Sequence, residues 1–306
     1  MSLLEERLRA GARVITVEFP VSVGASPEPV YAGVAALAGR VDAISVTDNS
    51  GAHAHASPLA VAALVRAAGG EPIMNLACRD RNRLALQSEL LGAALHGIEN
   101  IVCVTGDDVT QGDEPEARRV FDLDSPQLLS VAVTMQAGTF LSGRSIDPPP
   151  RFFLGAVENP TAPPIGHRVE RALKKMRAGA SFFQLQLVFE LEPIAAFLAN
   201  AVSFGLCERA FILPSICILR SARQLRYMRD HVAGVVVPDA VLAGAESRPS
   251  QAQRDYCFEL AVSLARSLLE LPGVNGLHLI PLGGPELAIE LLDRLGPGPA
   301  ATQVAP

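Results

Sequence analysis

The chain has 306 residues, 49% of them hydrophobic and 19% charged, so it can bury a large core and still fall within the size of a single α/β barrel. Its formal net charge of −6 argues against non-specific nucleic-acid binding, which needs a basic surface. The amino-terminal stretch has no long apolar run, so we expect neither a signal peptide nor a membrane span. Five cysteines without a CxxC pair are typical of the reducing cytoplasm.

Apolar, strand-like runs alternate with helical patterns along the chain. The runs span residues 13–19, 41–47, 72–77, 100–106, 152–157, 181–187, 209–215 and 276–281. The helical patterns that follow them span 27–39, 58–68, 81–96, 126–137, 167–178, 191–204, 220–230 and 284–295. Eight such repeats predict an α/β fold, a single TIM (β/α)8 barrel. A doubly wound open sheet is the alternative, but no glycine-rich dinucleotide fingerprint follows the first run.

Three further segments frame this barrel. LLEERLRAG, ending at Gly11, predicts a short amphipathic helix before the first strand, and residues 244–271 predict a helical insertion before the last one. We therefore expect a barrel domain over 1–295 and a flexible tail over 296–306.

Polar residues lie at the carboxyl ends of several predicted strands. Because side chains alternate along a strand, Thr16 and Glu18 should both point into the barrel. The same alternation places the following residues inward: Ser45, Thr47, Asn75, Phe182, Gln184 and Gln186. In a TIM barrel this end carries the active site, so Glu18 is a candidate catalytic residue. A carboxylate buried beside an arginine explains Glu18 equally well at this point.

CRDRNR, residues 78–83, places a dense charge cluster directly after the third strand. Arg79 and Arg81 could bind the phosphates of a ligand, since a guanidinium group grips phosphate oxygens in a fork. The alternative is a solvated loop that begins the next helix.

Other candidates also have an ordinary structural explanation. Asp107 could cap a turn, Gln186 could satisfy backbone groups, and Lys174 and Lys175 could lie on a solvated helix face. AHAH, residues 52–55, lacks acidic or cysteine companions, so we interpret His53 and His55 as part of a solvated loop and expect no metal.

In combination, these segments resemble the methylenetetrahydrofolate reductase family, most closely the branch fused to homocysteine methyltransferase modules. The resemblance covers roughly residues 13–295. It rests on ITVEF, DAISVTDNS, the long block NLACRDRNRLALQSELLGAALHGIENIVCVTGD, GDEPEARRVFDLDS, FFLGAVENP, MRAGASFFQLQLVFE and GVNGLHLIPL. It implies a TIM barrel that holds FAD at its carboxyl-terminal face and reduces 5,10-methylenetetrahydrofolate to 5-methyltetrahydrofolate with NADH or NADPH. It also implies a role in one-carbon metabolism and methionine biosynthesis, and we expect a homo-oligomer.

The resemblance assigns roles to individual residues. Glu18 matches the catalytic glutamate, and Asp107 matches an aspartate near flavin and pterin. Gln184 and Gln186, with Asp107, are expected to bind folate. The residues expected to bind the cofactor are Thr47, Asp48, Asn75, Arg79, Arg81, Thr105, Gly106, Asp107, Lys174 and Lys175.

The sequence departs from the family pattern at several of these positions. Asn75 stands where the family usually has histidine, and Arg168 stands where an acidic residue often precedes the two lysines. Three alternatives therefore stay open: the same reduction without flavin, a deazaflavin-dependent methylene-tetrahydropterin reductase, and a non-catalytic folate- or flavin-binding subunit of a methyl-transfer complex.

Overall fold

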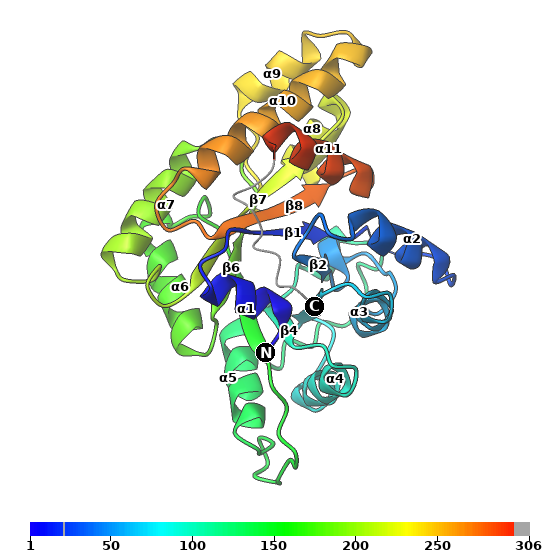
Figure 1. Cartoon of the computed structure of the whole chain (residues 1–306), viewed down its shortest axis with the longest axis vertical. Helices are drawn as coiled ribbons and strands as arrows, with labels where there is room; N and C mark the ends of the chain where they lie inside the picture. Colours follow the sequence, from blue (N-terminus) through cyan, green and yellow to red (C-terminus); the bar gives the residue numbers. More distant parts are fainter. Residues whose placement is uncertain (21, 297–306) are drawn as a thin grey trace.

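The structure, a computed structural model, describes residues 1–20 and 22–296. Eight parallel strands form a closed barrel in which each strand pairs with its neighbour in the chain and β1 closes on β8 (Figure 1). The strands are β1 (Val14–Glu18), β2 (Ala43–Val46), β3 (Pro72–Ala77), β4 (Asn100–Val104), β5 (Phe153–Glu158), β6 (Phe182–Leu185), β7 (Phe211–Ile218) and β8 (Gly276–Pro281). The predicted (β/α)8 barrel is confirmed.

Helices surround the barrel on its outer side (Figure 1). They are α1 (Leu3–Arg9), α2 (Glu28–Leu37), α3 (Pro58–Ala67), α4 (Arg83–Leu95), α5 (Ser125–Gln136), α6 (Arg168–Arg177), α7 (Glu192–Ser203), α8 (Ala222–His231), α9 (Asp239–Glu246), α10 (Ser250–Leu269) and α11 (Pro285–Leu295). Short 3-10 turns are η1 (Ser50–Ala52), η2 (Val109–Gln111) and η3 (Ile165–His167). Of the described residues, none belongs to a helix long and apolar enough to cross a membrane.

Two predicted elements differ from the structure. The run predicted at 209–215 continues to Ile218, because the apolar residues that follow Ser215 pair with β8. The predicted insertion at 244–271 is two helices, α9 and α10, separated at Pro249, whose missing N–H suits the start of α10. All of the predicted tail beyond Gly296 lies outside the described residues.

The amino-terminal end of the barrel is closed by its own side chains. Leu4 and Leu8 of α1 are buried against the lumen-facing starts of the strands, including Val14 and Phe182. Gly155 makes room for this floor, since a Cβ there would lie 2.3 Å from the Phe182 ring. The opposite, carboxyl-terminal end is therefore the end at which a ligand can reach the lumen.

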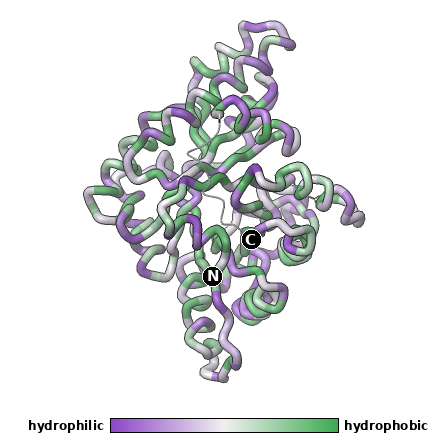
Figure 2. Tube along the Cα trace, in the orientation of Figure 1, coloured by the Kyte–Doolittle hydropathy of each residue, from purple (hydrophilic) through white to green (hydrophobic). Residues whose placement is uncertain are grey.

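The central strands are predominantly hydrophobic, whereas the helices alternate between hydrophobic and hydrophilic residues (Figure 2). The main core lies between the outward strand faces and the helices, and includes Val17, Ile44, Leu76 and Leu90. Polar residues inside the barrel are thus the exception, and their positions indicate where chemistry can occur.

Candidate active site at the carboxyl ends of the strands

Glu18 ends β1 and points into the barrel, as the alternation predicted. Its side chain keeps 29% of its surface exposed, and its Oε2 lies 4.0 Å from Nε2 of His278 on β8. Burial raises the pKa of Glu18 to about 7, because the site disfavours the charged carboxylate. No arginine or lysine of the described chain forms an ion pair with it. A carboxyl group that holds its proton near neutral pH can serve as a general acid.

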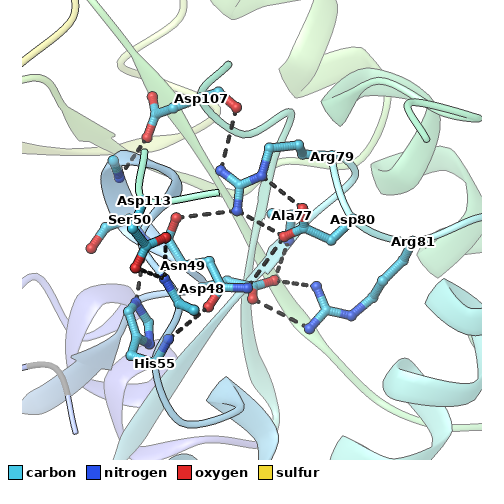
Figure 3. Close-up of polar contacts among 12 residues, drawn as sticks. Asp48, Asn49, Ser50, His55, Ala77, Arg79, Asp80, Arg81, Asp107 and Asp113 are labelled. Atoms are coloured by element: carbon cyan, nitrogen blue, oxygen red, sulfur yellow. Dashed lines mark hydrogen bonds and ion pairs between the residues drawn. The ribbon is translucent and has the colours of Figure 1, made fainter. Parts of the chain in front are cut away.

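Asp48, two residues after β2, anchors a network of charges at the neighbouring strand ends (Figure 3). Its side chain is fully buried and accepts a hydrogen bond of 2.8 Å from the backbone N–H of Ala77. Arg81 donates to both carboxylate oxygens, at 2.6 and 3.3 Å. The bidentate pair therefore joins the end of β2 to the loop that follows β3.

Arg79 is almost completely enclosed, with 2% of its side chain exposed. It donates to both oxygens of Asp80, at 2.8 and 2.7 Å, and to the carbonyl groups of Asn49 and Asp107. Its hydrogen bonds lower the pKa of Asp80. Both arginines of CRDRN thus have carboxylate partners within the protein.

The CRDRN stretch also begins a helix, as predicted. The side chain of Asn82 accepts hydrogen bonds of 3.1 Å from the backbone N–H groups of Leu84 and Ala85, which caps α4. Arg83 binds both oxygens of Asp122 in the loop before α5. The helix start is therefore joined to the long β4–α5 loop.

Asp107 ties this loop to the one after β2 (Figure 3). Its Oδ2 accepts a hydrogen bond of 2.9 Å from the backbone N–H of Gly51, and Asp113 accepts two from Ala54. Gly106 has φ +98°, and a Cβ there would lie 2.8 Å from that of Arg79, so glycine is required in the TGD motif. His55 belongs to the same loop and accepts from the backbone of Ser50 at 3.2 Å.

The remaining predicted residues fall into separate places. Gln184 is buried in the lumen with its amide nitrogen 3.3 Å from Nδ1 of His278, whereas the Gln186 side chain accepts from the N–H of Leu187. Asn75 lies 3.4 Å from the hydroxyl of Ser45. Thr47 is buried after β2, and Thr105 is exposed and accepts from the backbone of Ser125.

Lys174 and Lys175 differ from each other although they are adjacent on α6. Lys174 is exposed. Lys175 is buried, donates to Oε2 of Glu158 at 2.9 Å and to the carbonyl of Val157, and its pKa is lowered by burial. Arg168 lies 3.5 Å from the other oxygen of Glu158 and donates to the carbonyls of Ala162 and Pro163. This ion-pair cluster packs α6 against the end of β5.

His278 and Thr16 also belong to the site. Thr16 was predicted to point inward but was given no role, and His278 was not predicted. Nδ1 of His278 lies 2.9 Å from the hydroxyl of Thr16, and burial lowers the pKa of the imidazole to about 3. A signal existed in GLHLIP, where the only polar residue of an apolar strand has the parity of a lumen-facing position.

A large cavity lies elsewhere. It has a volume of about 1220 Å³ and opens at the amino-terminal end between α1 and the ends of α2, α3, α10 and α11. Two of its arginines, Arg7 and Arg66, pair with Asp42 at 2.8 Å and Glu71 at 3.7 Å. None of the predicted site residues lines it. We therefore place the candidate site at the carboxyl-terminal end of the barrel. The position of Glu18, and not the volume of a cavity, decides this choice.

A TIM barrel with a protonatable carboxyl group at the carboxyl ends of its strands has the architecture of a barrel enzyme. The family is shown by sequence: the family model for methylenetetrahydrofolate reductase matches residues 3–296. The chain belongs to the methylenetetrahydrofolate reductase family.

Solved structures share this fold. A protein from Clostridium thermocellum, described as uncharacterized and as binding two copies of 5-methyl-5,6,7,8-tetrahydrofolic acid, superposes with a TM-score of 0.69 at 14% sequence identity, covering 96% of this chain and 97% of that one. The EDTA monooxygenase of Chelativorans sp. BNC1 superposes with a TM-score of 0.52 at 11% identity, covering 92% of each chain. At these identities the likeness establishes the barrel alone.

The FAD that the resemblance implies carries a diphosphate, which needs cations or free N–H donors. Of the four cations predicted to bind it, Arg79, Arg81 and Lys175 are already bound to carboxylates of this protein. The fourth cation, Lys174, is exposed. The cation set present therefore does not fit a diphosphate, and the roles of these residues toward FAD stay a prediction.

Proposed function

We propose that this protein reduces 5,10-methylenetetrahydrofolate to 5-methyltetrahydrofolate, with Glu18 as the general acid and NADH or NADPH as the reductant. The observation that carries the proposal is the position of Glu18, an inward carboxyl group with a pKa near 7 and no cationic partner. Membership of the reductase family supports the reaction class.

The chemistry explains why an acid is needed. The methylene carbon is bonded to N5 and N10 of the folate, and hydride can add to it only after the bond to N10 breaks. Breaking that bond leaves its electron pair on N10, which takes a proton from Glu18. Hydride addition to the resulting N5 iminium carbon gives the methyl group, while the dihydronicotinamide is oxidised. The reaction thus consumes one hydride and one proton, and Glu18 regains its proton from water.

The other predicted folate contacts have compatible positions. Gln186 follows β6 on the same barrel end as Glu18, and Asp107 is exposed in the loop after β4. An exposed carboxylate beside the mouth can accept hydrogen bonds from the amino and N–H groups of a pterin. We propose that both residues orient the pterin ring.

Two forms of the reaction differ in the hydride carrier. The sequence resemblance predicts FAD between nicotinamide and folate. The pairing of Arg79, Arg81 and Lys175 with carboxylates favours the second form, in which the nicotinamide transfers hydride directly to the folate.

A further candidate is a folate-binding protein without catalysis. The C. thermocellum barrel is described only as binding 5-methyltetrahydrofolate, the product of the proposed reaction, and this favours folate binding without requiring turnover.

An anaerobic assay distinguishes these functions. The purified chain is incubated with methylenetetrahydrofolate and NADH or NADPH, with and without added FAD, and the product is identified by mass. We expect 5-methyltetrahydrofolate to form without added flavin. Turnover only with FAD would establish the flavin-dependent form, and folate binding without turnover under every condition would leave the binding protein.

A further inference from the structure

His278 is the polar centre of a layer buried beneath Glu18. The ring is 4% exposed and lies on β8 beside β1, where His278 pairs in register with Thr16. Its Nδ1 lies 2.9 Å from the Thr16 hydroxyl and 3.3 Å from the amide nitrogen of Gln184, while its Nε2 lies 4.0 Å from Oε2 of Glu18. The two ring nitrogens therefore face different chemistry.

The partners of Nδ1 determine where the imidazole carries its proton. The amide nitrogen of Gln184 can only donate, whereas the Thr16 hydroxyl can donate either to Nδ1 or to the carbonyl of Leu277, 3.4 Å away. A nitrogen that faces a donor of this kind must offer its lone pair, so the proton of the neutral ring is on Nε2. Burial keeps the ring neutral, since it lowers the pKa of His278 to about 3.

We propose that His278 is a positioning residue whose Nε2–H group, 4.0 Å from Oε2 of Glu18, acts electrostatically on that oxygen and so places the acidic proton of Glu18 on Oε1. This inference rests on the proposed function for its catalytic consequence. The oxygen that faces an N–H donor is the poorer place for the carboxyl proton. Protonated Glu18 therefore carries its proton on Oε1, the oxygen that does not face His278.

His278 does not compete for that proton. Its Nε2 already holds hydrogen, and its Nδ1 is occupied by donors, so the ring cannot accept a proton from Glu18 without becoming a buried cation. After proton transfer, the same Nε2–H stabilises the Glu18 carboxylate. In the described chain, the titratable groups that face Glu18 are His278 and Cys217 on β7, and burial with the nearby Glu18 raises the pKa of that thiol.

The tautomer can be measured on the full chain without any substrate. The chain has six histidines, and comparison of the 15N spectrum with that of His278→Gln identifies the signals of His278. We expect the Nε2–H tautomer and no titration of the ring across the neutral range. An Nδ1–H tautomer, with the Gln184 amide turned to offer its oxygen, would overturn the inference whatever the activity.

Variants test the consequence for Glu18. His278→Phe keeps a ring but removes the donor, so the carboxyl pKa of Glu18, followed by 13C NMR, should rise above that of the wild type, and folate reduction should slow by roughly tenfold. His278→Gln restores an amide donor at similar reach and should recover most of both. Thr16→Ser keeps the hydroxyl beside Nδ1 and should keep the tautomer of the wild-type 15N spectrum, whereas Thr16→Val removes that hydroxyl and should weaken the preference for this tautomer.

The outcomes separate this inference from the proposed function. A Glu18 pKa that rises in His278→Phe, when even the wild type reduces no folate, would sustain the positioning role of His278 and remove the proposed reaction. Normal folate reduction with an unchanged Glu18 pKa in a folded His278→Phe variant would remove the positioning role alone.

Discussion

Two neighbouring parts of the barrel mouth treat their charges in opposite ways. At the ends of β2, β3 and β4, Asp48, Arg79 and Arg81 lie within a closed set of ion pairs and hydrogen bonds (Figure 3). At the ends of β1 and β8, Glu18 faces the neutral imidazole of His278 and has no cationic partner among the described residues. Paired charges hold loops in place, whereas an unpaired carboxyl group retains a proton that it can give away. Residues that the sequence grouped as one site therefore have two roles. The paired charges at the ends of β2, β3 and β4 hold the loops in place, and Glu18 is the group that can donate a proton.

The same contrast changes the interpretation of the CRDRN block. A guanidinium group that already binds a buried carboxylate must break that contact before it can bind a phosphate. Breaking a buried pair is costly, because the remaining charge has no partner. The cluster is therefore better explained as the framework of the mouth than as a phosphate site.

Arg81→Ala should give the largest effect on stability. The substitution leaves the fully buried Asp48 with only the Ala77 N–H, so we expect a loss of about 3–5 kcal/mol in the free energy of unfolding. The double variant Asp48→Asn with Arg81→Met removes both charges and should lose much less. Chemical denaturation measures both. A stable Arg81→Ala protein whose only defect is weak FAD binding would restore the cofactor interpretation.

Lys175→Met should have a smaller effect, about 2 kcal/mol, because Arg168 still faces Glu158 at 3.5 Å. The matched control is Glu158→Gln with Lys175→Met, which leaves no unpaired carboxylate. Lys174→Met, on the exposed neighbour, should leave the melting temperature unchanged. Thermal melts with and without FAD distinguish structure from binding: an unchanged melting temperature with lost FAD affinity would place Lys175 in a cofactor site.

The pH dependence of stability should reveal the unpaired state of Glu18. Its pKa in the folded protein, about 7, lies above the ordinary value of 4.5, so the folded state binds the extra proton between these values. The wild type should therefore lose stability as pH rises from 4.5 to 7, by on the order of 2 kcal/mol. Glu18→Gln should lack this loss, so its advantage over the wild type should grow with pH. Since His278 is present in both proteins, its titration cancels in the difference.

That difference is measured by urea denaturation at pH 5 and pH 8.5. A constant difference between the two proteins would show that Glu18 ionises normally and is stabilised by charges elsewhere.

Gly106→Ala should give the smallest effect, about 1–2 kcal/mol, because the residue has φ +98° and its Cβ would press on Arg79. Strain there should disturb the paired region and leave the carboxyl pKa of Glu18 as it is. The melting temperature and the 13C signal of Glu18 test the two halves of this expectation. A large shift of the Glu18 signal would show that the two regions are coupled.

The barrel was predictable because its signal is local and repeated. Apolar runs and helical patterns alternate eight times, and the parity of ITVEF places Thr16 and Glu18 inward as observed. The end of β7 was not predictable in the same way, since its last three residues extend the strand only through their pairing with β8.

The partners of the charged residues were not available from the sequence. Arg81 meets Asp48 across 33 positions, and Lys175 meets Glu158 across 17, so only the closed barrel shows that these cations are occupied. Glu158 lies one residue beyond the predicted end of its strand, which hid its outward parity. The order of residues along the chain indicates that charges gather at the ends of the strands. The three-dimensional pairing decides which of them remain without a partner.

The most direct test of the account is the rate of folate reduction by Glu18→Gln under anaerobic conditions, measured beside folate affinity and a thermal melt. Glutamine keeps the shape of the side chain but cannot supply the proton for N10. We predict a loss of roughly 10²–10⁴-fold in the rate, with folate binding and folding retained. Reduction at the wild-type rate by a folded Glu18→Gln protein would contradict the central claim that Glu18 is the acid.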